Sequence, residues 1–267
     1  MSVIRDILEE AQASERVEAA EYRQAVQSVP AAKVELDVPP GLAAEVRALR
    51  ENIELLSGLN RVQTIGISGC TPGAGASTVA SLLALSMAGG YITNGNGNGN
   101  GTNAHPGSVG KTDVLSKGIL LVDSNVAMPG VARLLGISPV PGLVEVLSGS
   151  IVWPKAVRLV NEGRLKVITA GRTHPSAAEL VTSARMHRLI DEFRDRFNRV
   201  IVDLPSAATN VEAVRIGQWL DGVVLVVWAG KTRTDVAREV IDRLVAAKVR
   251  VLGIVLNRRR EVLPQGL

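Results

Sequence analysis

Several features that would mark a secreted or membrane-spanning protein are scarce or missing in this chain. Cys70 is the only cysteine among 267 residues, so no disulfide framework can form, and we expect a cytoplasmic location. The first ten residues lack the apolar core of a signal peptide. No uninterrupted apolar run approaches the ~18 residues of a membrane-spanning helix, so we expect any link to a membrane to pass through a partner.

A strong charge of either sign is missing as well. The chain has 30 Lys and Arg against 26 Asp and Glu, a formal net charge of +4 that is spread along the sequence. Such a mild balance gives little support for binding to nucleic acid, and we expect none as a partner. Apolar sequence is abundant instead, because 46% hydrophobic residues are enough for one sizeable α/β core with extensions.

From Arg61 onward, strand-like and helix-like segments alternate. Short runs that are apolar on both faces are typical of buried parallel strands, and the helical segments between them imply right-handed crossovers. We therefore predict an α/β fold, a doubly wound, mostly parallel sheet with helices on both faces. The predicted strands cover residues 62–67, 118–122, 165–169, 200–202, 222–227 and 251–256.

Three further segments define the expected domain limits. Residues 1–40 predict an exposed N-terminal helix and a proline-rich linker, followed by the main domain at 41–267. Within that domain, residues 91–117 contain an Asn/Gly run that cannot bury a core, so we expect a disordered surface insert there. The domain should open with a helix over residues 42–56, whose apolar stripe consists of Val46, Leu49, Ile53 and Leu56.

A glycine-rich run, Gly69-Cys-Thr-Pro-Gly-Ala-Gly-Ala-Ser-Thr78, lies between the first predicted strand and a predicted helix at 79–87. This is the setting of a phosphate-binding loop (P-loop), in which backbone N–H groups and a helix N-terminus hold phosphate. Ala76 stands where such a loop carries its lysine, so the glycines and hydroxyls remain and the cation is gone. The candidate binding residues are Pro72, Gly73, Ala74, Gly75, Ala76, Ser77 and Thr78.

Two aspartates at the ends of predicted strands are the candidate catalytic residues. Asp123 follows strand 118–122, and Asp203 follows strand 200–202. An Asp at a strand end is common, but the carboxyl ends of parallel strands share one edge with the P-loop, so both acids are expected to face the nucleotide crevice. With Ser77 of the loop, Asp123 and Asp203 are the expected ligands of Mg²⁺.

Taken in order, these segments carry a resemblance. The sequence resembles the cytoplasmic domain of bacterial tyrosine kinases, a family of the MinD/ParA-like P-loop class, from about residue 42 to 257. That resemblance implies binding of ATP or ADP with Mg²⁺, although a site without any cofactor stays open. The matching stretches are residues 71–78, 121–125, 142–149, 170–180, 202–205 and 251–257.

Departures from the family pattern bear on activity. The family's loop reads Pro-Gly-Glu-Gly-Lys-Ser-Thr, whereas this chain has Ala74 and Ala76 at the Glu and Lys positions. Its second acidic motif is Asp-x-Asp, and here the second acid is Asn125. The family's C-terminal tyrosine cluster is missing, since Tyr22 and Tyr91 are the only tyrosines. The sequence is therefore that of a degenerate family member.

The resemblance also implies partners. Arg47 and Arg50 match two members of the family's Glu-x-x-Arg-x-x-Arg oligomerisation motif, with Ala44 at the Glu position, so we expect this helix to be an interface. The implied partner is the cytoplasmic tail of a membrane polysaccharide co-polymerase, which would hold the protein at the periphery of the inner membrane. An active kinase paralogue or a second copy of the chain are further expected partners.

These observations favour a non-catalytic or strongly impaired, pseudokinase-like regulator of exopolysaccharide or capsule biosynthesis and export. One alternative is an active ATP-dependent protein-tyrosine kinase or ATPase of the same family that takes its cation from Lys111, Lys117 or Arg133. Another is a MinD/ParA-like positioning ATPase, which needs an early loop lysine where this chain has Thr71.

Overall fold

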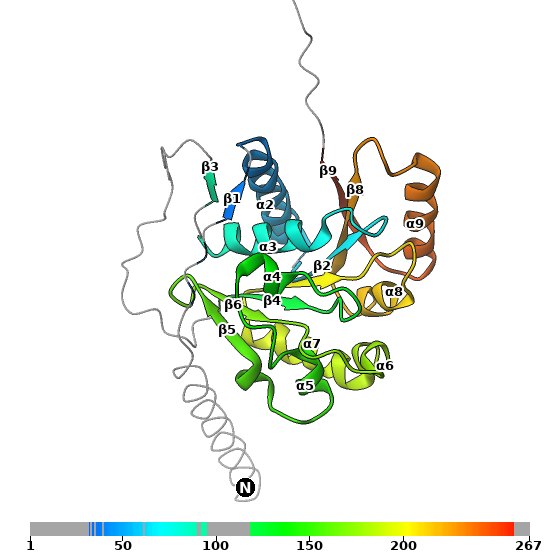
Figure 1. Ribbon diagram of the computed structural model, residues 1–267. Helices are drawn as coiled ribbons and strands as arrows, with labels where there is room; N and C mark the ends of the chain where they lie inside the picture. The colour runs from blue at the N-terminus through cyan, green and yellow to red at the C-terminus, as the bar shows by residue number, and fades with distance from the viewer. Residues whose placement is uncertain are drawn as a thin grey trace, which may run out of the picture.

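The centre of the computed structural model, which describes residues 32, 34, 36–38, 40–60, 62–89, 92–94 and 118–258, is a seven-stranded sheet (Figure 1). The strands lie in the order β5-β6-β4-β7-β2-β8-β9, and all neighbours are parallel except β5 and β6. The predicted sheet is therefore confirmed. Its strands are β2 (Thr64–Gly69), β4 (Ile119–Asp123), β5 (Val157–Val160), β6 (Leu165–Ile168), β7 (Arg199–Leu204), β8 (Gly222–Trp228) and β9 (Val251–Asn257).

Helices cover both faces of this sheet, as predicted. Apolar residues of α2, α3 and α4 form one buried cluster with one face, and those of the remaining helices form a second cluster with the other. Figure 1 shows α3 and α7 on opposite sides of the central strands. The helices are α2 (Pro40–Asn60), α3 (Ala76–Met87), α4 (Val131–Leu135), α5 (Leu143–Leu147), the 3₁₀ helix η1 (Trp153–Ala156), α6 (Ala177–Val181), α7 (Ala184–Arg196), α8 (Val211–Gly217) and α9 (Thr234–Ala246).

The central strand β7 explains why two helical layers are needed. Val200 and Val202 pack in the cluster that contains α7 and α8, whereas Ile201 between them packs in the cluster that contains α3. Side chains alternate between the two faces of a strand, and here both faces are apolar. Burial of apolar surface stabilises the fold by about 25 cal/mol per Å², so each face requires its own cover.

The edge strand β5 is missing from the predicted strands. It runs antiparallel to β6, with Val157 opposite Ile168. Only four residues long, β5 includes the partly exposed Arg158, and its apolar pattern is too short to separate from a loop. The antiparallel hairpin that it forms with β6 extends the sheet beyond the predicted parallel strands.

Part of the expected N-terminal linker contributes to this fold. Ala32 forms a bridge with Val160, and the N–H group of the buried Val34 donates to Asn161 Oδ1 at 2.8 Å. We therefore propose that the domain begins near Ala32 rather than at residue 41. The predicted helix at the N-terminus lies outside the described residues.

A small second sheet corrects the expected start of the insert. β1 (Leu36–Val38) pairs in parallel with β3 (Ile92–Asn94), and β3 falls within the expected disordered insert at 91–117. Residues 92–94 are instead a strand, because their backbone groups find partners in β1. The Asn/Gly run of that insert lies outside the described residues.

The helix α2 is longer than the predicted 42–56 and begins at Pro40, whose missing N–H is not needed at a helix start. Its predicted apolar stripe faces the protein interior on the side of α3: Val46 and Ile53 are buried, and Leu49 and Leu56 pack against the cluster that contains Ile53. In the described part of the chain, α2 and the other helices lack the combination of length and apolar character that crossing a bilayer requires.

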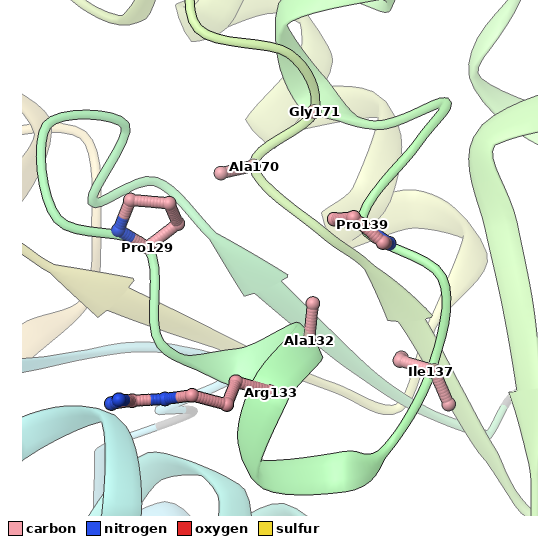
Figure 2. Close-up of a pocket in the computed structure, with 7 residues that line it drawn as sticks. All are labelled: Pro129, Ala132, Arg133, Ile137, Pro139, Ala170 and Gly171. Carbon is pink, nitrogen blue, oxygen red and sulfur yellow. The ribbon is translucent and has the colours of Figure 1, made fainter.

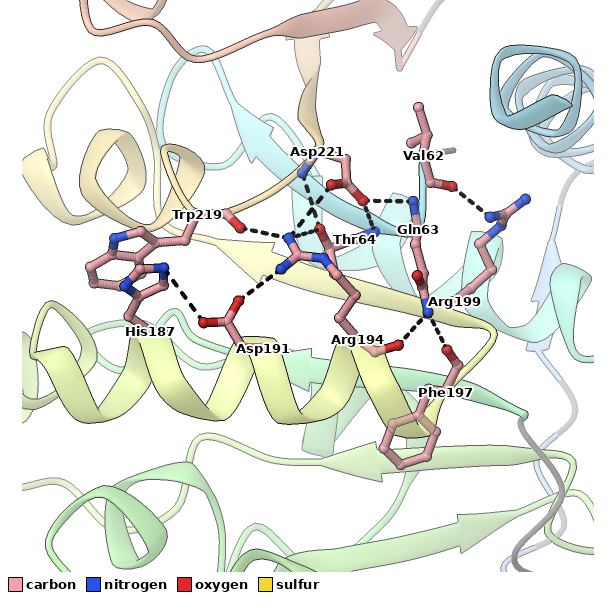
Figure 3. Close-up of polar contacts among 10 residues, drawn as sticks. All are labelled: Val62, Gln63, Thr64, His187, Asp191, Arg194, Phe197, Arg199, Trp219 and Asp221. Carbon is pink, nitrogen blue, oxygen red and sulfur yellow. Dashed lines mark hydrogen bonds and ion pairs between the residues drawn. The ribbon is translucent and has the colours of Figure 1, made fainter. Parts of the chain in front are cut away.

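A polar network links the strands at their N-terminal ends, which are opposite to the P-loop (Figure 3). Asp221, which precedes β8, accepts hydrogen bonds of 2.7 Å from the N–H groups of Gln63 and Thr64 at the start of β2. Arg194 of α7 reaches the same carboxylate at 3.5 Å and donates to the carbonyl oxygen of Trp219 at 3.0 Å. These contacts anchor the strand that carries the P-loop against its neighbour β8.

Candidate nucleotide site

The P-loop has the backbone shape that its glycines predict. It connects β2 to α3, and the φ angles of Gly73 and Gly75 are +77° and +95°, in the left-handed region that favours glycine. Gly75 is the N-cap of α3, so Ala76 is the first helical residue. The N–H groups of a first helical turn have no partner within the helix, and together with the loop they form a donor set suited to phosphate.

Asn257, at the end of β9, holds the loop in this shape. Its Nδ2 donates to the carbonyl oxygen of Ala74 at 2.8 Å, and the residue is buried. A side chain at Gly75 would collide with the same Nδ2 atom, so the loop requires glycine there. The sequence gives no sign of this role, because it depends on β9 lying beside β8 and β8 beside β2.

Asp123 and Asp203 meet next to the loop, as their strands predict. They are register partners on the neighbouring strands β4 and β7, and both are fully buried. The Asp123 carboxylate accepts hydrogen bonds from the N–H groups of Asn125, Gly130 and Val131 at 3.1–3.2 Å. In contrast, neither carboxylate oxygen of Asp203 has a hydrogen-bond partner at normal bonding geometry among the described residues, although the Ser77 hydroxyl lies close enough to act on its pKa.

This burial raises the proton affinity of both acids. Burial raises the pKa of Asp123 to about 6, although its three N–H bonds act in the opposite direction. The pKa of Asp203 is raised well above its usual range, first by burial and then by the neighbouring charge of Asp123, while the Ser77 hydroxyl lowers it. A buried carboxylate without a hydrogen-bond donor requires a proton or a cation beside it.

Ser77 completes the expected metal-binding group. A Cβ atom on Gly130 would lie 2.8 Å from Ser77 Oγ, so Ser77 faces the turn that holds Asp123. Over the described ranges, no three His, Cys, Asp or Glu side chains gather closely enough to hold a metal by themselves. Two carboxylates and a hydroxyl nevertheless fit Mg²⁺, which keeps several waters and binds phosphate oxygens. The unpartnered Asp203 is the feature that this ion would satisfy.

The lysine position is occupied by Ala76, which is partly exposed at the start of α3. Of the three cations expected to compensate, Lys111 and Lys117 lie outside the described residues. Arg133 on α4 is exposed, and Figure 2 shows its side chain extending away from Ala170 and toward the cyan ribbon of α3.

Asn125, at the position of the family's second acid, is engaged in its own turn. Its N–H group donates to Asp123 Oδ1, and its side-chain Oδ1 accepts a hydrogen bond from the N–H group of Met128 at 3.3 Å. The amide thus caps the segment after β4 and carries no charge. Asp123 and Asp203 are left as the acids of the site.

A small cavity opens beside this segment, with a volume of about 240 Å³ (Figure 2). Pro129 on its wall precedes Gly130, the donor to Asp123, so the cavity adjoins the acids without containing them. Its lining is mainly apolar and consists of Pro129, Ala132, Arg133, Ile137, Pro139, Ala170 and Gly171.

Glu145 joins the two matched stretches that lie outside generic P-loop motifs, residues 142–149 and 170–180. Its Oε2 accepts a hydrogen bond from the N–H group of Gly142 at 2.8 Å, and its Oε1 accepts one from Arg172 at 3.1 Å. Gly142 approaches the backbone of Gly171 so closely that no side chain would fit. The resemblance in these stretches thus reflects a packed contact between α5 and the segment after β6.

The two arginines expected at an interface differ in their surroundings. Arg47 is exposed on α2. Arg50 is only partly exposed, and its Nη1 donates to the carbonyl oxygen of Ser86 at 3.0 Å, while its Nε lies 3.3 Å from Glu54. Arg50 therefore fastens α2 to the C-terminal end of α3, which leaves Arg47 as the accessible member of the pair.

Comparison with known proteins places these features in a family, although no protein-family model matches the chain. The chain is 29% identical over 223 residues to tyrosine-protein kinase YwqD of Bacillus subtilis, a match that covers 83% of this chain and 84% of YwqD. It is 27% identical over 218 residues to tyrosine-protein kinase CpsD of Streptococcus agalactiae, with 80% and 82% covered. The succinoglycan biosynthesis transport protein ExoP of Rhizobium meliloti is 32% identical over 146 residues, which are 53% of this chain and 18% of ExoP.

Solved structures agree with these sequence matches. The kinase domain of VpsO has a TM-score of 0.66 and 26% identity, covering 82% of this chain and 96% of that domain. MinD of Pyrococcus horikoshii, solved with Mg-ADP, has a TM-score of 0.54 at 19% identity over 74% of this chain and 72% of MinD, which shows a common fold. Fold and loop together define an α/β protein of the P-loop NTPase class. Its homologues are bacterial tyrosine-protein kinases.

Proposed function

We propose that this chain binds a nucleotide but is a non-catalytic or strongly impaired, pseudokinase-like regulator of exopolysaccharide or capsule biosynthesis and export. The observation that carries the proposal is Ala76, which occupies the lysine position of a loop that keeps its left-handed glycines. Asn125 adds a second loss, since it stands uncharged beside Asp123.

The size of the first loss supports an effect on catalysis. A charge-assisted hydrogen bond to phosphate contributes about 1.5–3 kcal/mol. Two such bonds missing from the transition state cost ~3–6 kcal/mol, on the order of 10² to 10⁴ in rate. Ala76 supplies no positive charge to the γ-phosphoryl group, where negative charge has to be stabilised during transfer.

Nucleotide binding depends on groups that the chain retains. The loop N–H groups would hold the phosphates, and Ser77 with Asp203 would hold Mg²⁺, whose charge would neutralise the buried acids. Support comes from Asp203, which is fully buried beside Asp123 and accepts no backbone N–H bond among the described residues. The MinD neighbour solved with Mg-ADP supports the same choice of ligand.

Purified protein is expected to show no ATP turnover above a protein-free control, because the transition-state charge is not neutralised at Ala76. Calorimetric titration should nevertheless detect binding of Mg-ADP and Mg-ATP, and Asp203→Ala should abolish the dependence of that binding on Mg²⁺. A steady rate that disappears in Asp203→Ala would instead establish the alternative, an active kinase or ATPase with an unorthodox cation. Absence of any nucleotide binding would contradict the proposal itself.

For partners, we propose docking on the cytoplasmic tail of a membrane polysaccharide co-polymerase, which would keep the protein at the inner membrane. An active kinase paralogue or a second copy of the chain would bind in the same assembly. Support comes from ExoP, a succinoglycan biosynthesis transport protein that matches over part of its length. The exposed side of α2, with Arg47 and the 69% exposed Leu55, is the proposed contact surface.

Arg47→Glu is expected to weaken this association about tenfold while leaving the fold intact, since a central arginine in an interface commonly contributes 1–2 kcal/mol or more (~10-fold). Arg50→Glu is unsuitable, because Arg50 holds α3 through Ser86. Arg188→Glu on the exposed face of α7 makes the same charge change elsewhere. Pull-down with the co-polymerase tail and sedimentation of the chain alone provide the measurement. Equal association of both variants would place the interface on another surface.

A further inference from the structure

Beside the P-loop lie two cations that the proposed function has not used. Lys231 Nζ is 3.9 Å, and the guanidinium carbon of Arg258 is 4.0 Å, from the ring centroid of Trp228. We call these three residues the cationic cluster. Trp228 itself adjoins the loop, because a Cβ atom on Gly73 would lie 3.6 Å from its ring. Both cations are exposed at the surface.

The cluster is fastened to the P-loop on its Lys231 side through hydroxyl groups. The hydroxyl of Thr232 accepts a hydrogen bond from the N–H group of Trp228 at 3.1 Å and lies 3.2 Å from the hydroxyl of Thr71, in the loop. The segment that carries Lys231 is therefore positioned by a contact with the loop itself.

On the Arg258 side, the side-chain amide of Asn257 connects the cluster to the P-loop. Asn257 Nδ2 donates to the carbonyl oxygen of Ala74 in the loop, and Asn257 Oδ1 accepts a hydrogen bond from the N–H group of Arg258, both at 2.8 Å. Arg258 has a φ angle of +60°, a conformation that is uncommon for a non-glycine residue. The position of its backbone is thus specified by the residue that also shapes the loop.

The charges of this cluster are uncompensated. Neither Lys231 nor Arg258 forms an ion pair with any residue that the structure describes. Because both lie within 4.0 Å of one ring centroid, they are closer together than about 8 Å, the screening length at physiological ionic strength. The face of the Trp228 ring attracts each cation, but it does not neutralise their charges, so the two cations still repel each other. An anion bound between loop and cluster would relieve it.

The strand order indicates which phosphate group of a nucleotide would be this anion. Asp123 and Asp203 end β4 and β7 on one side of β2, whereas the cluster follows β8 and β9 on the other side. A nucleotide that lies across the loop with its metal-bound phosphates at the acids has its α-phosphate side toward Trp228. We propose that Lys231 and Arg258 bind this α-phosphate side and supply the positive charge that the loop lacks at Ala76. The inference rests on the proposed nucleotide binding.

Calorimetry with Mg-ADP and Mg-ATP tests the assignment. Lys231→Ala and Arg258→Asn should each weaken binding of Mg-ADP about tenfold, and the double variant about 100-fold, as expected for lost charge-assisted contacts. Asn is chosen because it tolerates positive φ. The double variant Lys155→Ala with Arg188→Ala removes the same charge from exposed positions elsewhere and should bind as the wild type does. Since the cations contact the phosphate nearest the nucleoside, ADP and ATP should bind the wild type within about threefold of each other.

The outcomes separate the two proposals. If the wild type binds no nucleotide, the proposed function fails. If the wild type binds but the Lys231/Arg258 double variant binds equally well, only the assignment to the cluster is wrong. Tryptophan fluorescence provides a second test in proteins that keep both Lys231 and Arg258, so it does not depend on how the cation variants fold. Nucleotide should change the fluorescence of the wild type, and Trp228→Phe should lose this change. A change that persists in Trp228→Phe would overturn the assignment.

Discussion

Asp203→Asn is expected to make the nucleotide-free protein more stable at pH 8, by about 3 kcal/mol in the free energy of unfolding. Wherever Asp203 is ionised, its substitution removes a penalty of that order, because the carboxylate is fully buried beside Asp123. The amide that replaces it keeps the shape of the side chain and can donate to Asp123, its register partner. Most substitutions of buried residues destabilise a protein, so a gain in stability is a specific result.

The gain should depend on pH, with a sign that follows from the raised pKa values. Asp123, with a pKa of about 6, and Asp203, with a pKa raised well above its usual range, hold protons in the folded state that the unfolded chain has released. Stability therefore falls as pH rises from about 4 through these folded-state values. For Asp123 this loss amounts to about 3 kcal/mol. The difference between Asp203→Asn and wild type should be small near pH 4 and should grow as the pH rises toward 8.

Thermal and urea unfolding at both pH values measure this effect, and Asp221→Asn supplies a matched control. Asp221 is partly buried but accepts hydrogen bonds from Gln63 and Thr64 and contacts Arg194 (Figure 3). Its neutralisation should destabilise the protein by about 1–3 kcal/mol, opposite in sign to Asp203→Asn. Mg²⁺ with ADP should stabilise the wild type far more than Asp203→Asn. A destabilised Asp203→Asn, or an equal shift at pH 4 and pH 8, would show that Asp203 is satisfied in the free protein.

The position of the acids follows from sequence for a physical reason. Parallel strands end at the same edge of a sheet, so the sequence places Asp123, Asp203 and the loop at one edge, and they meet there because β4, β7 and β2 are neighbours. The glycines of the loop were equally predictable, because the left-handed angles of Gly73 and Gly75 are what such a turn requires. The angles of the glycines and the positions of the acids at strand ends depend on local pattern alone.

Other parts of the site depend on tertiary arrangement and could not be read from the sequence. Asn257 and Trp228 reach the loop because β8 and β9 lie beside β2, an order that hydrophobic pattern does not encode. Arg50 fits the expected interface motif, yet its contact with Ser86 shows only in the packing of α2 on α3. The five-residue helix α5 is fixed by Glu145 rather than by helix propensity.

Ala76→Lys is expected to strengthen the binding of Mg-ATP about 10–100-fold. A lysine at the first position of α3 starts from a helix end already shaped for phosphate, and its charge-assisted contacts contribute about 1.5–3 kcal/mol. Ala76 is partly exposed, so the longer side chain has a route out of the core. Ala88→Lys adds the same charge at the other end of α3 and should leave the affinity unchanged. Titration calorimetry at constant ionic strength makes the comparison.

Adding Asn125→Asp to Ala76→Lys should return some ATP turnover, because the site regains a carboxylate two residues from Asp123. Recovery of hydrolysis is expected to be weaker than recovery of binding. The side chain of residue 125 now accepts a hydrogen bond from Met128, so an aspartate there stays partly engaged in its turn. Ala74 also remains in place of the family's Glu. A double variant with a normal circular dichroism spectrum but no gain in nucleotide affinity would mean that the loop no longer holds phosphate. The loss at Ala76 would then be a consequence of a remodelled site rather than its cause.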